Sequence, residues 1–287
     1  MGAAQYWFDS HDGLRLHSLV YAGPAATAPV LLCLHGLMRN ARDFEELAPR
    51  LAQRYRVIVP DVRGRGLSAR DPQFNNYQLP VYIKDTLVLL SGLGATRVSI
   101  IGTSMGGLMA MLLAAMQPGL VTGVVLNDVG PELDPAGIER IRGYAGKTPA
   151  VRNWAEAIAQ VRSVYGSVWP DLSEADWEKL VRRGYRANAQ GIPEVDADPL
   201  IREPLRDNQT AAPDLWPLWG ALARIPVLAI RGEHSDLLSA ATLARMQRKP
   251  ATTALTVANR GHAPLLDEPG CVAAIEAFLA ALPGAAH

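Results

Sequence analysis

The segment Gly102-Thr103-Ser104-Met105-Gly106-Gly107 is the most informative stretch of this sequence. It follows an apolar run at residues 98–101, which is typical of a strand buried on both faces. It precedes residues 105–116, which are apolar on nearly every side, as expected of an interior helix. A Gly-x-Ser-x-Gly pattern between a strand and a helix predicts a strained turn that lifts the serine hydroxyl above the carboxyl end of a sheet. Because the dipole at a helix N-terminus favours developing negative charge, Ser104 is a candidate nucleophile.

Strands and helices alternate on both sides of this turn. Apolar runs predict strands at residues 30–34, 57–59, 98–101, 123–126, 226–230 and 254–257. Helical patterns lie at residues 41–54, 80–90, 105–116 and 270–282. An antiparallel edge hairpin is predicted at residues 5–21, with its turn at Asp12-Gly13. This alternation predicts an α/β fold, with a mostly parallel sheet covered by helices on both faces.

The pattern changes in residues 131–215. Helices are predicted there but no convincing strand, and several prolines interrupt the return to the α/β pattern. One helix is predicted at residues 151–165, and the spacing in Leu172–Asp176 predicts a capping box that starts another. We therefore expect an α/β core formed by residues 1–130 and 216–287, interrupted by a helical block.

Composition excludes several classes of partner. The chain has 287 residues, with 28 Lys plus Arg and 28 Asp plus Glu, so its formal net charge is zero and no global field attracts nucleic acid or an anionic membrane. No apolar stretch approaches the roughly 18 residues of a membrane span, and the first residues lack a secretory pattern, so a cytoplasmic location is the default expectation. Cys33 and Cys271 lie in apolar patterns, which indicates buried thiols rather than a disulfide. No metal or cofactor is expected.

A serine hydroxyl is a weak nucleophile at neutral pH and needs a base. His262 is the preferred candidate, because it follows the strand predicted at residues 254–257 in a loop formed by Asn259-Arg260-Gly261. A loop can carry an imidazole over the serine, whereas the interior of a strand cannot. His234 is a weaker alternative. His35 is expected to brace its own loop through hydrogen bonds rather than to act as the base.

The acid that orients the histidine has two candidates. Asp236 lies in the loop after the strand at residues 226–230, and Asp128 directly follows the strand at residues 123–126. Both positions are at the carboxyl end of the predicted sheet, where a carboxylate would fix the histidine tautomer and stabilise the imidazolium. Asp236 is the preferred acid. Asp128 is the alternative acid, or else a cap for the turn into the helical block.

These motifs resemble those of the α/β-hydrolase superfamily over nearly the whole chain, apart from the helical block. The similar segments are His35-Gly36, residues 61–68, the turn at Ser104, residues 232–236 and Gly261-His262. The last three of them follow the order serine, acid, histidine that the superfamily uses. The resemblance implies an eight-stranded sheet and a helical cap formed by residues 131–215. It also implies an oxyanion hole made by the backbone N–H groups of Leu37 and Met105. Arg63 and Asp61 in the second of these segments are expected to pair or to brace loops rather than to contact substrate.

The resemblance further implies hydrolysis of a carboxylic ester or lactone through an acyl-serine intermediate. The expected pocket is mainly apolar, which favours a small uncharged substrate. The side chains expected to line it are His35, Met38, Trp154 and Leu237.

Other functions stay open at this point. One is C–C bond hydrolysis of a dienoic ring-fission product, for which Arg39 and Asn40 would bind carboxylates. A cofactor-free haloperoxidase or perhydrolase reaction is a second, and a non-catalytic receptor on the same fold is a third. The chain is also compatible with a homodimer.

Overall fold

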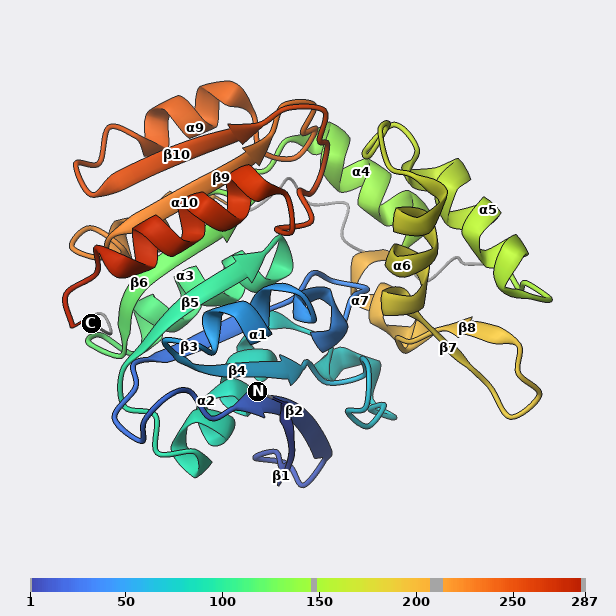
Figure 1. Ribbon diagram of the computed structural model, residues 1–287, viewed down its shortest axis with the longest axis horizontal. Helices are drawn as coiled ribbons and strands as arrows, with labels where there is room; N and C mark the ends of the chain where they lie inside the picture. Colours follow the sequence, from blue (N-terminus) through green and yellow to red (C-terminus); the bar gives the residue numbers. More distant parts are fainter. Residues whose placement is uncertain (1, 146–148, 207–213, 285–287) are drawn as a thin grey trace.

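Eight strands form the central sheet of the computed structural model, which describes residues 2–145, 149–206 and 214–284. They are β1 Ala4–Asp9, β2 Arg15–Tyr21, β3 Val30–Leu34, β4 Arg56–Asp61, β5 Val98–Thr103, β6 Val121–Asn127, β9 Val227–Gly232 and β10 Thr252–Val257. Their order is β1-β2-β4-β3-β5-β6-β9-β10 (Figure 1). The β1–β2 hairpin is antiparallel, as is the pairing of β2 with β4, and all other neighbours are parallel. The predicted sheet and its edge hairpin are therefore confirmed.

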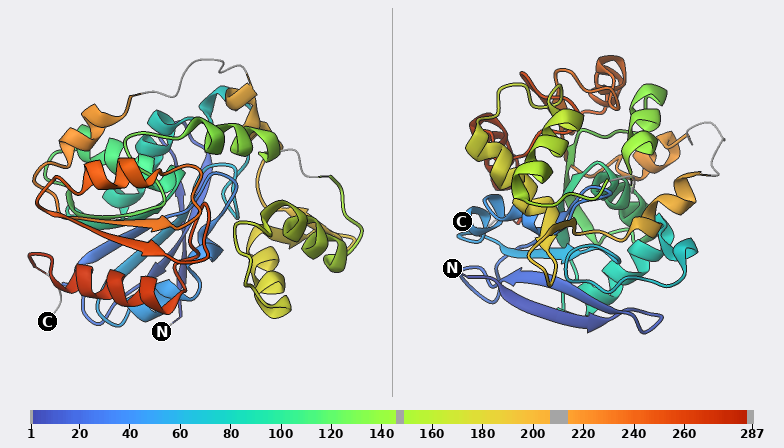
Figure 2. Two further views of the ribbon diagram at one scale, coloured as in Figure 1. Left: turned by 90° about the horizontal axis from the view of Figure 1, so that it is seen from above. Right: turned by 90° about the vertical axis from the view of Figure 1, so that its right-hand side faces the viewer.

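Helices cover both faces of this sheet, as Figure 2 shows. One face carries α2 Leu79–Gly92, α3 Met105–Met116, α8 Trp216–Ala221 and α9 Ala240–Met246. The other face carries the short 3-10 helix η1 Ala41–Phe44, α1 Leu47–Leu51 and α10 Pro269–Ala280. Successive side chains of a strand point to opposite faces, so Ile100 of β5 enters the first core and Ile101 enters the second. The central strands are mostly apolar on both faces for this reason, with exceptions such as Ser99 on β5 and Thr122 on β6.

The predicted helix at residues 41–54 is the main departure within the core. The chain there forms η1 and α1 as two short pieces, with Glu45 and Glu46 between them. Asn40 caps η1, because its side chain accepts from the N–H of Arg42. No helix in the described parts of the chain is long and apolar enough to cross a membrane.

The cap lies beyond the carboxyl ends of the parallel strands (Figure 1). It contains α4 Pro135–Tyr144, α5 Trp154–Tyr165, α6 Glu174–Gly184, β7 Tyr185–Ala187, β8 Pro193–Val195, the 3-10 helix η3 Pro199–Arg202 and α7 Glu203–Arg206. Helix α6 begins with the predicted capping box of Ser173 and Asp176. Trp169 and Trp177 pack together in a core that belongs to the cap.

The expectation that this block contains no strand is wrong. Strands β7 and β8 form an antiparallel hairpin separate from the main sheet. Each has only three residues, too few for the alternation that identifies a strand in a sequence. The turn between them contains Gly191, whose φ of 77° is readily adopted only by glycine.

Candidate active site

Ser104 lies at the tight turn between β5 and α3. Its φ of 52° and ψ of −113° are strained for a residue with a side chain, and its N–H donates to the carbonyl of Asn127 at 2.9 Å. Gly106 permits the turn, because a Cβ there would collide with the carbonyl group of Leu34 on β3. The predicted strand–turn–helix geometry is present, and Ser104 lines a cavity between the sheet and the cap.

His262 lies in the loop after β10, where its Nε2 is 2.9 Å from Ser104 Oγ. Two hydrogen bonds between this loop and the cap hold it in place. The N–H of Gly261 donates to the carbonyl of Val168 at 2.8 Å, and Trp169 Nε1 donates to the carbonyl of Ala263 at 3.0 Å. The structure thus brings together the serine and the histidine that the sequence singled out.

The carboxylate against His262 belongs to Asp128, which corrects the preference for Asp236. Asp128 Oδ2 lies 2.8 Å from His262 Nδ1, and the Asp128 side chain is fully buried. The same oxygen accepts from the Ser235 hydroxyl at 2.6 Å, while Oδ1 accepts from the N–H of Gly232 at 2.8 Å. A proton on Nδ1 facing this carboxylate leaves Nε2 free to accept from Ser104.

Asp236 faces a different partner, Arg140 of α4. Both oxygens of Asp236 accept from Arg140, with Arg140 Nη2 2.8 Å from Oδ1. Burial acts to raise the pKa of Asp236, but the hydrogen bond and charge of Arg140 outweigh it and hold the pKa below its usual value. The loop after β9 therefore directs Ser235 toward Asp128 and Asp236 toward the cap.

One buried guanidinium touches both residues expected to form the oxyanion hole. Arg65 Nε donates to the carbonyl of Leu37 at 2.9 Å, and Arg65 Nη2 lies 3.7 Å from the sulfur of Met105. Arg65 Nη1 also donates to the hydroxyl of Tyr82 at 2.9 Å, which fixes its own position. Leu37 lines the cavity next to Ser104. Arg65 therefore holds the loop after β3 against the start of α3.

His35 braces the same loop through two hydrogen bonds of its ring. Its Nδ1 donates to the carbonyl of Gly36 at 2.8 Å, and its Nε2 accepts from the N–H of Val62 at 3.0 Å. Burial lowers the pKa of His35 to about 4, so the ring is neutral near neutral pH and keeps the lone pair that accepts from Val62. His35 has the bracing contacts expected of it, and it does not belong to the cavity wall.

The cavity at Ser104 has a volume of about 110 Å³. Its wall combines core loops with cap side chains, among them Ile141, Val161, Tyr165, Trp169 and Leu180. Of the expected lining residues, Met38 is in this wall, whereas Trp154 and Leu237 are not. Arg182 stacks over Trp154, with the guanidinium carbon 4.5 Å from the ring centroid, and Leu237 is buried beside Gly137.

The cavity wall is more polar than the sequence suggested. It includes Arg39, Asp43 and Arg183 besides the apolar side chains. Arg39 pairs with Asp43, and Arg183, which is 3% exposed, donates from Nε to Glu45 at 2.8 Å. Asn40 does not face a substrate, because its Nδ2 donates to the carbonyl of Arg183 at 2.9 Å and its oxygen caps η1. The contacts of Arg183 connect α6 of the cap to the core.

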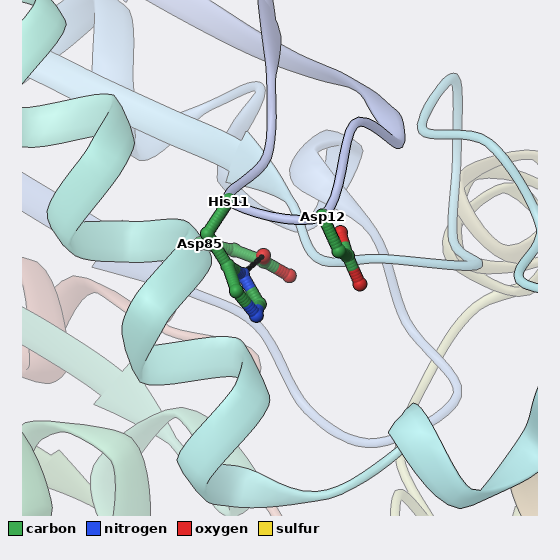
Figure 3. Close-up of side chains that lie close together, drawn as sticks. All are labelled: His11, Asp12 and Asp85. Carbon is green, nitrogen blue, oxygen red and sulfur yellow. Dashed lines mark hydrogen bonds and ion pairs between the residues drawn. The ribbon is translucent and has the colours of Figure 1, made fainter.

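A second polar cluster lies outside the cavity wall, near the turn between β1 and β2. Figure 3 shows His11, Asp12 and Asp85 close together. Each offers one nitrogen or oxygen atom that could bind a metal, and these atoms lie within 4.8 Å of one another. Arg63, which is fully buried, donates to Asp12 at 2.9 Å and to Asp85 at 2.8 Å, and it also pairs with Asp71. A guanidinium already occupies these carboxylates and would repel a cation. Arg63 therefore has a bracing role, as expected, but its carboxylate partners do not include Asp61, whose Oδ2 lies 2.8 Å from His17 Nδ1.

Sequence reasoning missed three residues that support the site. Ser235 holds Asp128, Arg65 holds Leu37, and Trp169 holds the loop of His262. Ser235 and Arg65 both lie in segments that resemble superfamily loops, so a search for side-chain donors in those segments would have found them. Trp169 had no such signal, because its contact crosses from the cap to the core.

Comparisons with known proteins agree with this architecture. A family model described as alpha/beta hydrolase fold matches residues 29–269. The chain is 35% identical over 274 residues to a 3-hydroxybutyrate-oligomer hydrolase from Cupriavidus necator, with 92% of this chain and 93% of that protein covered. It is 27% identical over 237 residues to a 2-(acetamidomethylene)succinate hydrolase from Mesorhizobium japonicum, with 82% of each covered.

A solved structure gives the same result. The crystal structure of an alpha/beta hydrolase from Novosphingobium aromaticivorans matches with a TM-score of 0.92 and 44% sequence identity, covering 97% of this chain and 98% of that chain. The family match spans most of the chain, and the fold and strand–turn–helix motif are those described above. This chain is therefore a member of the α/β-hydrolase family.

Proposed function

We propose that this protein is a serine hydrolase that cleaves carboxylic esters, with Ser104 as nucleophile, His262 as base and Asp128 as the orienting acid. The observation that carries the proposal is the continuous contact from Asp128 through His262 to Ser104, with distances of 2.8 and 2.9 Å. Nucleophile, base and orienting group within hydrogen-bond reach are what acyl transfer by serine requires.

The reaction would proceed in two steps. Ser104 Oγ attacks the ester carbonyl while its proton passes to His262 Nε2, and Asp128 stabilises the resulting imidazolium. The N–H groups of Leu37 and Met105 would donate to the oxyanion of the tetrahedral intermediate. Collapse returns the proton from His262 to the departing alcohol and leaves the acyl group on Ser104. A water molecule, deprotonated by His262, then releases the acid and restores the serine.

The relatives and the cavity both support a substrate class. The relative from Cupriavidus necator, of which 93% is covered by this chain, is named a 3-hydroxybutyrate-oligomer hydrolase, and the units of such an oligomer are joined by ester bonds. The cavity at Ser104 is small and mainly apolar, with a few polar groups, which suits a short acyl unit. We therefore favour short esters of hydroxy acids, with lactones as the cyclic form of the same bond.

The test uses p-nitrophenyl butyrate and two variants. Ser104→Ala and His262→Ala should each lower kcat by at least about 10³-fold, because each removes one member of a unit that acts together. The KM should change far less than kcat. Wild-type turnover in either variant would refute the proposal. Circular dichroism and thermal unfolding of both variants serve as the control for folding.

A second candidate is hydrolysis of a substrate that carries carboxylates, as the name of the 2-(acetamidomethylene)succinate hydrolase indicates for that relative. Arg39 and Arg183 in the cavity wall favour this candidate, since guanidinium groups recognise carboxylates. C–C bond hydrolysis of a ring-fission product belongs to the same class of charged substrates. Comparing kcat/KM for p-nitrophenyl butyrate with that for 2-(acetamidomethylene)succinate and for a dienoic diketone acid separates these candidates.

A further inference from the structure

A second and larger cavity adjoins the one at Ser104. It has a volume of about 480 Å³ and lies between the cap hairpin β7–β8 and the loop after β4 that contains Arg70. Its apolar wall includes Tyr185, Ile192, Pro193, Val195 and Ala197. The cavity at Ser104, at about 110 Å³, is smaller than most small-molecule sites, whereas the larger one falls in their usual range of roughly 300–1,000 Å³. The second space therefore offers room for a substrate longer than one short acyl unit.

Met38 connects the two spaces, because it lines both cavities. It is half-buried and follows Leu37, the residue expected to supply an oxyanion donor. A methionine side chain is unbranched and adapts its shape readily, so it can separate or join the two cavities at little cost. A linear substrate with its scissile bond at Ser104 can thus extend past Met38 toward the cap hairpin.

The far end of the larger cavity is polar. Arg70, Asn188 and Glu194 line it, and they also line a smaller neighbouring cavity. Glu194 accepts from Asn188 Nδ2 at 2.6 Å. Asp196, at the same end, accepts from Arg42 at 2.6 Å and from Arg186 at 2.9 Å.

Arg70 differs from these neighbours. It is exposed and makes no hydrogen bond or ion pair with any residue in the described ranges, while each of the other charged groups at this end has a partner. A cation that has no partner among the described residues, at the end of an apolar groove, suits an elongated ligand that ends in a carboxylate.

We infer that this groove, from Met38 to Arg70, binds the leaving-alcohol portion of a linear hydroxy-acid oligoester and that Arg70 contacts its terminal carboxylate. The inference rests on the proposed ester hydrolysis at Ser104. In such an oligomer, cleavage of an ester bond transfers the acyl part on the hydroxyl side to Ser104. The departing alcohol is the part that retains the free carboxylate. The departing alcohol takes the proton from His262, and water later releases the acyl part, so each turnover consumes one water.

The experiment compares a linear 3-hydroxybutyrate trimer as its free acid with the same trimer closed by a primary amide. For the wild-type protein, kcat/KM should be about fivefold higher for the acid, as an exposed charge pair contributes up to about 1 kcal/mol. Arg70→Gln should remove this preference by lowering kcat/KM for the acid alone. Glu194→Gln removes a negative charge at the same end without changing the size of the side chain. It should increase the preference for the acid over the amide.

A third variant tests the groove itself. Ile192→Trp should narrow it and lower kcat/KM for both trimers by about tenfold or more, while turnover of p-nitrophenyl butyrate stays within about twofold, because that ester does not reach the hairpin. The butyrate ester also shows that each variant is folded. An acid-to-amide ratio that is the same in wild type and Arg70→Gln would overturn the inference, as would equal losses on the trimers and the butyrate ester. If the enzyme cleaves the butyrate ester through Ser104 but does not cleave the trimer, the inferred role of the groove is refuted. The proposed function is not affected by that result.

Discussion

Two aspartates follow neighbouring strands of the sheet, yet their surroundings differ completely. Asp128 comes directly after β6, is fully buried, and accepts from His262, Ser235 and the N–H of Gly232. Asp236 comes after β9, is about one-third exposed, and pairs with Arg140 of the cap. Because β6 and β9 are paired in parallel, both loops lie at the same edge of the sheet. Topology therefore places both candidates near the histidine, and the contacts within each loop select between them.

The difference shows what an orienting carboxylate requires besides position. Asp128 is held by donors on both oxygens, so its geometry against His262 Nδ1 is fixed before any substrate binds. Asp236 is held by a guanidinium from a different element, and its charge is used to connect α4 to the core. Replacing each aspartate in turn tests this distinction, and Asp128→Asn should have the larger effect.

Replacing Asp128 should lower kcat far more than replacing Asp236. Asp128→Asn keeps the size of the side chain but removes the charge that stabilises the imidazolium and favours the wrong histidine tautomer. We expect kcat for p-nitrophenyl butyrate to fall by about 10³- to 10⁴-fold with KM nearly unchanged, as measured by steady-state kinetics. A loss of less than about tenfold would mean that Asp128 is not the acid.

Replacing Asp236 should have a small effect on the same assay. Asp236→Asn should change kcat by less than about threefold and lower the free energy of unfolding by at most about 1 kcal/mol, because it removes a partly exposed ion pair. The pKa of Asp236 lies below the ordinary 3.8, so the pair contributes stability above that pH and loses it as the pH falls and the carboxylate is protonated. Unfolding followed from pH 7 to pH 3 should show a slightly steeper decline for wild type than for the variant. A kcat loss as large as that of Asp128→Asn would reverse the assignment.

Much of the core could be predicted from the sequence, because its local and global signals agree. The run at residues 98–101, the glycines around Ser104 and the apolar helix that follows all favour one geometry. His262 was identifiable for a related reason, since the residues before it form a loop and the strand before that is apolar. In both cases the decisive information lies within about ten residues.

The acid and the cap could not be predicted in the same way. The choice between Asp128 and Asp236 depends on the partner of each. Ser235 is far along the chain from Asp128, and Arg140 is far along the chain from Asp236. The hairpin β7–β8 is too short to show a strand pattern. The wall of the cavity combines segments from core and cap, so Trp154 and Leu237 could not be separated from Trp169 and Leu180 by residue type alone.

Covalent labelling tests the central claim most directly, namely that Ser104 is the nucleophile activated by His262 and Asp128. The protein is incubated with a p-nitrophenyl phosphonate, release of p-nitrophenol is followed by absorbance, and the modified residue is identified by peptide mass spectrometry. One adduct should form, on Ser104, at similar rates in wild type and Asp236→Asn and far more slowly in Asp128→Asn. An adduct on another residue, or labelling of Ser104 that is slowed by Asp236→Asn and not by Asp128→Asn, would contradict this account.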